Sequence, residues 1–400
     1  MISVAEARER ILATAPAPRP EVVMVSQALG RVLAAPVLAR RTQPPADMSA
    51  MDGYAVRAED VAEAGAKLRV IGEAPAGRPF AGRVGPGEAV RIFTGGETPE
   101  GADAVVLQED AERTDDTVVF SEAATLGRHI RRAGLDFVAD ETMIPSGSRM
   151  TPRNLALAAG MNVVWATVAR RPRIAILATG DEIRMPGDTL GPGQIIGSSG
   201  LAVAGMATEL GADPVMLEVA RDNEAALLAA ADAARGADIL VTLGGASVGD
   251  HDLVQDVLGK AGLEVDFWRI AMRPGKPLMF GKLGPQLVLG LPGNPVSTMV
   301  CATLFLAPLI KRMQGVAEVD PPMTTAIAMT PLKANDRRED YLRAKLSRSA
   351  DGELQATPFF VQDSSMMSVF AASDCLIVRP PHAPATDAGV PVPVLLLDSL

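Results

Sequence analysis

Four stretches of the chain combine glycine with acidic, basic and hydroxyl side chains, a mixture that a purely structural loop does not need. They are residues 49–55, residues 179–182, residues 244–252, and a cationic segment at 272–277 that is followed by 292–297. Acids and cations gathered on loops are typical of sites that bind a phosphate-bearing substrate together with a metal ion. These stretches are therefore the candidate functional site.

The stretch at 244–252 is rich in glycine and has the composition of an anion-binding loop. Glycine accepts positive φ angles and leaves its backbone N–H groups exposed, and such a nest beside a helix N-terminus binds phosphate. Carboxylates beside a phosphate site imply a hard cation, because they would otherwise repel the anion. Mg²⁺ fits best, since it prefers oxygen ligands and keeps several waters.

Individual residues in these stretches also have simpler interpretations. Asp222 and Asp250 could each be a helix cap or a turn residue, and that alternative stays open. Arg273 and Lys276, in contrast, offer fixed positive charge to an oxyanion. His251 is more simply a solvated loop histidine than a general base.

Several well-known catalytic motifs are absent or incomplete. The chain has no G-x-x-x-x-G-K-[ST] phosphate loop and no G-x-G-x-x-G at a strand–helix turn, which argues against a nicotinamide enzyme. Residues 245–249 match the G-x-S-x-G nucleophile elbow and follow a strand. However, Asp250 and Asp252 resemble the cap of a helix that begins too late for an elbow, and only His382 lies downstream as a base. A serine hydrolase is therefore a minor alternative.

The elements that must position these loops alternate between strand and helix from residue 172 onward. The predicted strands are 173–178, 214–219, 238–243, 264–270 and 286–291, and the predicted helices are 198–210, 224–234, 253–261 and a long one from 296. This alternation predicts a mostly parallel sheet with helices on both faces, and ligands of such sheets bind at the carboxyl ends of the strands. The polar stretches from 179 onward follow these strand ends.

The flanking regions have a different texture. A capping box at Ser3 and Glu6 begins an amphipathic helix, a second helix is predicted over 25–33, and Thr151-Pro152 begins a third. Short β-type runs separated by Gly/Pro turns fill the region between the second and third helices and the last ~80 residues. We predict four domains: a discontinuous helical linker domain (1–43 plus 127–170), an inserted β-rich domain (44–126), a three-layer, doubly wound α/β domain (171–318) and a C-terminal β-barrel (319–400).

Composition narrows the class of protein. The 400 residues carry a net charge of −10, so general nucleic-acid binding is not expected, because phosphate contacts need a basic surface. Cys301 and Cys375 sit in apolar surroundings and are expected to be buried free thiols. The longest apolar runs, 155–169 and 296–310, fall short of the ~20 residues that a membrane span needs. We expect a cytoplasmic protein with no membrane partner.

Taken together, the polar stretches resemble the molybdopterin molybdenumtransferase family, which includes the E domain of gephyrin. The matching motifs occur in the family's order and span nearly the whole chain: SAMDGYA from Ser49, FTGG from Phe93, ATGDEI from Ala178, LGGASVGDHD from Leu243, MRPGKP from Met272 and LPGNPVS from Leu291. The resemblance implies a homodimer of four-domain subunits with the active site in a cleft between subunits. It also implies adenylated molybdopterin and molybdate as substrates, a requirement for Mg²⁺, and release of AMP when the phosphoanhydride is cleaved.

The resemblance assigns roles by motif position. Catalytic roles fall on Asp52, Thr94, Glu182, Asp252 and Lys276, and Mg²⁺ or the pyrophosphate would be held by Asp181, Glu182, Asp222, Asp250 and Asp252. The anion nest would come from Gly244, Gly245 and Ser247, and molybdate would be received by Arg273, Lys276 and Ser297, with Arg338 or Arg343 and Ser364 or Ser365 reaching in from the barrel. Arg273 departs from the family's KPGKP-like loop, and its planar fork binds an oxyanion differently from a lysine.

Two other functions stay open on the sequence alone. One is a scaffolding protein that binds molybdopterin without turnover, as gephyrin's scaffold role suggests. The other is a related phosphohydrolase that acts on a different nucleotide. AMP release with and without molybdate separates these alternatives from the transferase.

Overall fold

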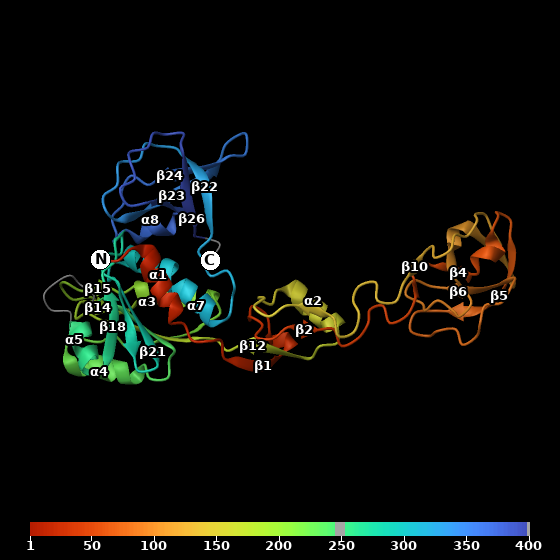
Figure 1. Cartoon of the computed structure of the whole chain (residues 1–400), viewed down its shortest axis with the longest axis horizontal. Helices are drawn as coiled ribbons and strands as arrows, with labels where there is room; N and C mark the ends of the chain where they lie inside the picture. The colour runs from red at the N-terminus through yellow and green to blue at the C-terminus, as the bar shows by residue number, and fades with distance from the viewer. Residues whose placement is uncertain (245–252, 398–400) are drawn as a thin grey trace. The chain divides into compact units, whose positions relative to one another are not determined.

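The computed structural model describes residues 1–244 and 253–397 (Figure 1). These residues form two compact units. Unit 1 comprises Met1–Glu21, Gly30–Ala34 and Val168–Leu400, and unit 2 comprises Val22–Leu29 and Ala35–Thr167. Gly245, Ser247, Asp250, His251 and Asp252, all named above as candidates or alternatives, lie outside the described residues.

A six-stranded sheet forms the centre of the α/β part of unit 1. Its strands lie in the order β16 (Asp213–Met216), β13 (Arg173–Ala178), β17 (Ile239–Leu243), β21 (Gln286–Leu291), β20 (Met279–Leu283) and β18 (Leu263–Trp268). The first four strands are parallel, β20 runs antiparallel to β21, and β18 runs antiparallel to β20 and so in the direction of the first four. The predicted mostly parallel sheet is therefore confirmed, and the loops after β13, β17 and β21 open at one edge.

Helices cover both faces of this sheet and make three layers. One face packs against α1 (Val4–Ala13), α3 (Ser199–Glu209) and the continuous helical segment α6 (Pro295–Cys301), η4 (Ala302–Leu306, a π-helix) and α7 (Ala307–Met313). The other face packs against α4 (Glu224–Ala233) and α5 (Leu253–Lys260). Period-2 alternation in β13 explains the two cores, because Ile174 and Ile176 enter the first while Ala175 and Leu177 enter the second.

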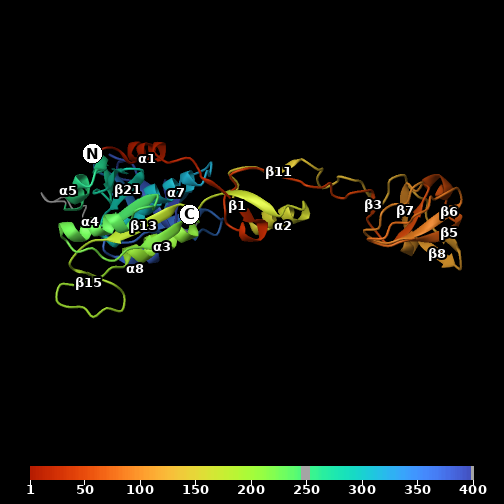
Figure 2. The same ribbon diagram turned by 90° about the horizontal axis from the view of Figure 1, so that it is seen from below.

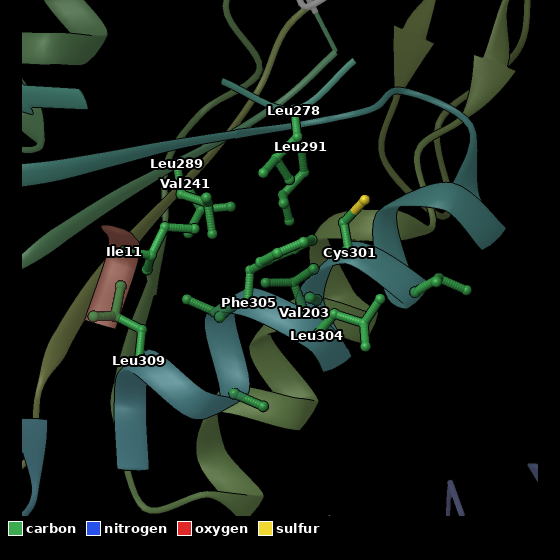
Figure 3. Packing of buried hydrophobic residues seen from close by; sticks show 14 of the residues in the cluster. Ile11, Val203, Val241, Leu278, Leu289, Leu291, Cys301, Leu304, Phe305 and Leu309 are labelled. Carbon is green, nitrogen blue, oxygen red and sulfur yellow. The ribbon is translucent and has the colours of Figure 1, made fainter. Parts of the chain in front are cut away.

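The first core is where the long C-terminal helical segment is buried. Figure 3 shows Phe305 and Leu309 of that segment gathered with Ile11, Val241 and Leu289. The segment Pro295–Met313 is the one described helical stretch long and apolar enough to cross a membrane by length and composition, but 89% of its most apolar window is buried in this core. Burial of this kind is what a core helix shows.

A closed five-stranded barrel follows the α/β part. Its ring runs β23 (Glu339–Arg348), β24 (Leu354–Pro358), β22 (Met323–Ala328), β26 (Pro391–Leu396) and β25 (Cys375–Arg379), and β25 pairs back onto β23. The short strand β19 (Met272–Arg273) joins the outside of β23, and α8 (Met367–Ala371) contacts α6. The predicted C-terminal barrel is confirmed, although β22 had no clear sequence signal.

A small excursion leaves the sheet directly after β13. It contains the parallel pair β14 (Ile183–Arg184) and β15 (Ile195–Ile196), and Figure 2 shows the loop between them standing out from the rest of unit 1.

Unit 2 is built around a curled six-stranded sheet. The strands lie in the order β7 (Ala104–Leu107), β4 (Gly53–Val56), β6 (Glu88–Ile92), β5 (Lys67–Ala74), β9 (Thr117–Phe120) and β8 (Ala111–Thr114). Smaller elements complete it: β2 (Val37–Leu38) with β11 (Thr142–Ile144), β3 (Met48–Ser49) with β10 (Ile130–Arg131), α2 (Pro152–Gly160), and the 3-10 turns η1 (Val25–Gln27), η2 (Ala58–Val61) and η3 (Gln108–Asp110). β1 (Pro20–Met24) and β12 (Trp165–Ala169) form a two-stranded sheet.

Helix predictions at the flanks had mixed outcomes. Ser3 caps α1 by accepting from the backbone N–H of Glu6, and Thr151 caps α2 with proline at its first turn, as predicted. The helix predicted over 25–33 is wrong: only the 3-10 turn η1 forms, because Gly30 interrupts the helical backbone with φ +72°. The four domain boundaries proposed from the sequence stay a prediction.

Candidate functional site

A pocket of about 740 Å³ lies at the carboxyl ends of β13, β17 and β21 in unit 1. Its walls include Thr179, Glu182, Asp222, Gly244 and Ser297. The parallel strands end at the same edge of the sheet, which is why residues more than a hundred positions apart share one cavity. Sequence reasoning predicted this edge.

Backbone geometry keeps the floor of the pocket open. Gly244 adopts φ +88°, which a side chain rarely tolerates, and a Cβ there would meet the carbonyl oxygen of Thr179 at 3.1 Å. A Cβ on the neighbouring Gly293 would lie 3.5 Å from the Cα of Gly244. Small residues therefore let the β17 and β21 loops approach each other.

Two carboxylates meet at the pocket. Asp181 and Asp222 each accept the backbone N–H of the other at 3.4 Å, which joins the loops after β13 and β16. The helix cap proposed for Asp222 is wrong, because Asn223 caps α4 by accepting from Ala226. The Asp222 carboxylate therefore accepts a hydrogen bond from the loop after β13 and does not cap α4.

Glu182 completes the acidic side of the pocket. Its carboxylate lies so close to Gly180 that a Cβ on that glycine would meet it at 2.6 Å. Gly180 adopts φ +138°, so the turn that carries Asp181 and Glu182 depends on glycine. Across residues 1–244 and 253–397, no group of three or more His, Cys, Asp or Glu side chains is arranged to hold a metal ion.

Thr179 is a pocket residue in the candidate stretch 179–182 for which the sequence analysis proposed no role of its own. It is 4% exposed, it lines the pocket, and its hydroxyl oxygen has no hydrogen-bond partner among the described residues. A buried hydroxyl without a partner is costly unless a ligand or water satisfies it. Its place directly after β13, inside the ATGDEI motif, was the available signal.

The cationic segment 272–277 is pinned to the underlying helix. Gly275 adopts φ +109°, and a Cβ there would meet the Sγ of Cys301 at 2.5 Å. The carbonyl of Lys276 accepts the N–H of Ile270 at 3.0 Å, which fixes the segment's backbone. The Lys276 side chain is half-buried, and its ammonium forms no ion pair or hydrogen bond with the described part of the chain. The described residues therefore leave its charge unpaired.

Arg273, at the other end of that segment, is already engaged. Its guanidinium forms an ion pair with Asp340, and it lies 3.7 Å from Asp336 and 3.3 Å from the side-chain oxygen of Asn335. All three partners belong to the C-terminal barrel region. The expected free cation is thus neutralised by carboxylates.

The barrel carries a buried arginine toward the same region. Arg343 is 1% exposed and donates from Nη2 to the carbonyl of Asp363 at 3.1 Å, while its Nε has no described partner. Burial lowers the pKa of the Arg343 guanidinium. Arg338, the alternative candidate, is instead bound to Asp336 at 2.7 Å, and that contact holds the pKa of the Asp336 carboxyl far below its usual range.

The serine stretch of the barrel docks on the start of α6. Ser364 accepts the N–H of Val296 at 3.1 Å and the side-chain amide of Asn294 at 2.9 Å. Ser365 donates to Asp363 at 2.6 Å, a bond that lowers the pKa of the Asp363 carboxyl. These contacts bring the stretch next to Ser297 in the first turn of α6, so these residues of the α/β part and the barrel come together.

Two further candidates lie in unit 2. The Oδ1 atom of Asp52 accepts both the backbone N–H of Thr94 at 2.7 Å and its hydroxyl at 2.8 Å. These bonds lower the pKa of the Asp52 carboxyl, with a smaller contribution from the charge of Arg91. Asp52 is therefore an ionised carboxylate at neutral pH, with its second oxygen free of these bonds.

The thiols play no part in this chemistry. Cys301 and Cys375 are buried and free, as predicted, and burial raises the pKa of Cys375 to about 12 and that of Cys301 further. Neither is a thiolate near neutral pH.

Comparison with known proteins gives a consistent result. Three family models match: the MoeA N-terminal region (domains I and II) over residues 2–161, a probable molybdopterin binding domain over 175–312, and the MoeA C-terminal region (domain IV) over 325–397. A molybdopterin molybdenumtransferase of Haemophilus influenzae is 36% identical over 398 residues, covering 98% of each chain. One of Nostoc is 36% identical over 82% of this chain and 77% of its own.

Solved structures agree with the fold. A molybdopterin biosynthesis MoeA protein from Pyrococcus horikoshii superposes with a TM-score of 0.87 at 32% identity, covering 99% of both chains. A second structure of that name matches with a TM-score of 0.84 at 24% identity. Matches across nearly the whole length, in the N-terminal, central and C-terminal regions alike, show that this chain belongs to the molybdopterin molybdenumtransferase family.

Proposed function

We propose that this chain is a transferase of molybdenum cofactor biosynthesis that inserts molybdenum from molybdate into adenylated molybdopterin. A molybdate oxygen or a water attacks a phosphorus of the phosphoanhydride, whose P–O bond breaks to release AMP. The two dithiolene thiols then bind molybdenum, and their protons leave with one molybdate oxygen as water. The observation that carries this proposal is the pocket at the strand ends, where acidic residues and Ser297 line one cavity. The family's printed names and the molybdopterin-binding model supply the substrate class.

Mg²⁺ is the metal that we propose for the acidic side of the pocket. Asp181 and Asp222 are brought together by their reciprocal hydrogen bonds, and Glu182 follows on the same turn. Mg²⁺ is usually held by one or two carboxylates plus substrate phosphates and waters, so this donor set fits without a full protein cage. When bound, Mg²⁺ would neutralise phosphate oxygens during cleavage.

The protein's own residues align the reactants. The half-buried ammonium of Lys276 attracts the oxyanion, and the buried guanidinium of Arg343 adds charge from the barrel side. The Thr179 hydroxyl can donate to a substrate oxygen from the pocket wall. Phosphoanhydride cleavage depends mainly on charge stabilisation and alignment, so no covalent enzyme intermediate is required.

Release of AMP from adenylated molybdopterin, with Mg²⁺ and with molybdate present or absent, tests this proposal. Molybdate-dependent release supports the transferase. Release that ignores molybdate supports a phosphohydrolase, and tight binding without release supports a scaffold. Neither binding nor release would contradict the proposed substrate.

We also propose that the chain acts as a homodimer. Unit 2 exposes large apolar side chains on neighbouring segments, among them Leu29, Val164 and Trp165, each more than half exposed. Covering such a patch with a second copy would remove apolar surface from water. Light scattering should give twice the chain mass of 41.7 kDa at micromolar concentration, and Trp165→Ser should shift the equilibrium toward monomer. A monomeric parent protein would contradict the proposal.

Replacing Asp52 with asparagine is expected to cut turnover by at least about tenfold. The asparagine keeps a side-chain oxygen that can accept the two bonds from Thr94 and loses only the negative charge. The fold should therefore be retained. The lowered pKa means that Asp52 favours the folded state above its ordinary pKa and loses that effect as pH falls through the lowered value. The kcat of Asp52→Asn should therefore be lower than that of the parent at every pH near neutrality, as a pH–rate profile would show. Glu109→Gln, at an exposed carboxylate of the same unit, serves as the control.

A further inference from the structure

The guanidinium of Arg273 faces the C-terminal barrel and not an open anion site. It forms an ion pair with Asp340, and its two terminal nitrogens also lie near the side-chain oxygens of Asn335 (3.3 Å) and Asp336 (3.7 Å). Two of these three groups are carboxylates. The Asp340 carboxylate therefore offsets much of the charge that Arg273 could offer to a second anion.

Backbone pairing places Arg273 at the junction between the α/β part and the barrel. Strand β19 runs parallel to β23, with Met272 opposite Glu339 and Arg273 opposite Asp340. The N–H of Glu339 also donates to the carbonyl of Ala271 at 2.9 Å. The ion pair therefore reinforces the only described strand pairing that joins the cationic segment to the barrel.

Asp340 depends on Arg273 for its charge balance. Its side chain is 7% exposed, and its Oδ1 atom is buried with no hydrogen-bond partner among the described residues. The neighbouring cations have other hydrogen-bond partners: Arg338 binds Asp336, although its charge also interacts with Asp340, and Arg379 binds Thr386 and the carbonyl of Pro384. A buried carboxylate that loses its directly paired cation is strongly destabilising.

Lys276 and Arg343 are placed differently. The ammonium of Lys276 has no described partner, and Arg343 donates to a single carbonyl and keeps a buried Nε unpaired. Neither of them contacts a carboxylate oxygen in the described structure. Lys276 and Arg343 can therefore bind an oxyanion, whereas the charge of Arg273 is already paired with Asp340.

We propose that Arg273 is a positioning residue that anchors the C-terminal barrel on the α/β part through Asp340. This anchor places Arg343 and the serine stretch. Lys276 and Arg343 then supply the positive charge that binds the oxyanion. The oxyanion part of this inference rests on the proposed function, and the anchoring part does not. It replaces the expectation that Arg273 itself receives molybdate.

Four variants test the anchor: Arg273→Met, Asp340→Asn, the two combined, and Lys276→Met. Arg273→Met should lower the unfolding temperature by about 5–10 °C, because it leaves Asp340 buried and uncompensated. It should also speed hydrogen exchange of the Glu339 amide by at least tenfold. Adding Asp340→Asn removes the stranded charge and should recover most of both losses. Lys276→Met should change neither quantity.

Molybdate dependence of AMP release separates anchoring from direct binding. Arg273→Met should raise the half-saturating molybdate concentration several-fold, and the combined variant should bring it back toward the parent value. Lys276→Met should raise it by more, and a fifth variant that combines Lys276→Met with Asp340→Asn should show no recovery. If Arg273→Met weakens the molybdate response while stability and exchange stay unchanged, or if the combined variant shows no recovery, the anchor is wrong and Arg273 is a ligand.

AMP release tests the proposed function, and unfolding temperature with amide exchange tests the anchor, so either can fail without the other. If neither the parent nor any variant releases AMP, the proposed function is wrong. The unfolding temperature and amide exchange still decide whether Arg273 anchors Asp340. If AMP release is normal but the unfolding temperatures of Arg273→Met and the parent agree, the anchor alone is overturned.

Discussion

Replacing Lys276 with methionine is expected to lower molybdate-dependent AMP release by about 100-fold, because removing one preorganised charge from such a site typically costs a factor of 10² to 10³. The residue is half-buried and its ammonium has no described partner, so we expect its charge to act on the oxyanion. Methionine keeps the aliphatic stem and its packing. The unfolding temperature should therefore stay within about 2 °C of the parent's.

Steady-state kinetics at varied molybdate, alongside thermal unfolding, measures both effects. Lys282→Met, at an exposed lysine of β20, removes the same charge from the same part of the chain and should leave the kinetics unchanged. Lys276→Arg should retain more activity than Lys276→Met. A loss below fivefold in Lys276→Met, or an equal loss in the Lys282 control, would remove Lys276 from the site.

Replacing Gly275 with alanine is expected to destabilise the protein by about 2–5 kcal/mol. One part of the cost is conformational, because φ is +109°. The other part is steric, because the added Cβ would meet the Cys301 sulfur at 2.5 Å and the Met272 side chain at 3.1 Å. The whole cationic segment must shift in response, so molybdate-dependent turnover should fall as well.

Gly284→Ala is the matched control for Gly275→Ala. Gly284 also has a positive φ, +59°, but no atom lies within 4 Å of where its Cβ would be. It should show only the conformational cost, about 1–2 kcal/mol. Combining Gly275→Ala with Cys301→Ala should recover part of the steric cost in chemical unfolding. Equal destabilisation by the two glycine variants would show that Cys301 does not restrain the segment.

The sequence predicted the α/β part best. The strands at 173–178 and 286–291 match β13 and β21 residue for residue, because buried parallel strands are continuous apolar runs bounded by turn residues. It failed at 25–33, where only the 3-10 turn η1 forms, Gly30 adopts φ +72°, and Val25 is bound to the distant Val164. Local periodicity carries no information on such distant partners.

The candidate site shows the same division. Placing Glu182, Asp222 and Gly244 at one sheet edge followed from strand order alone, and the pocket lies there. The state of Arg273 did not follow, because its partner Asp340 is 67 positions away and only tertiary pairing brings them together. The role of Asp222 was ambiguous for a local reason, because the adjacent Asn223 can also cap the following helix.

Strand β23 belongs to three arrangements at once. It closes the barrel through β24 and β25, it pairs with β19, and it carries Arg343. Local opening of this one strand would remove a cation and release the cationic segment, and it would also withdraw Tyr341 from the core that the parallel sheet shares with the barrel. Proteins open in such cooperative pieces below their global melting point. We therefore expect heat inactivation to follow the opening of β23, and substitutions that stabilise the β19–β23 pairing should prolong activity at high temperature.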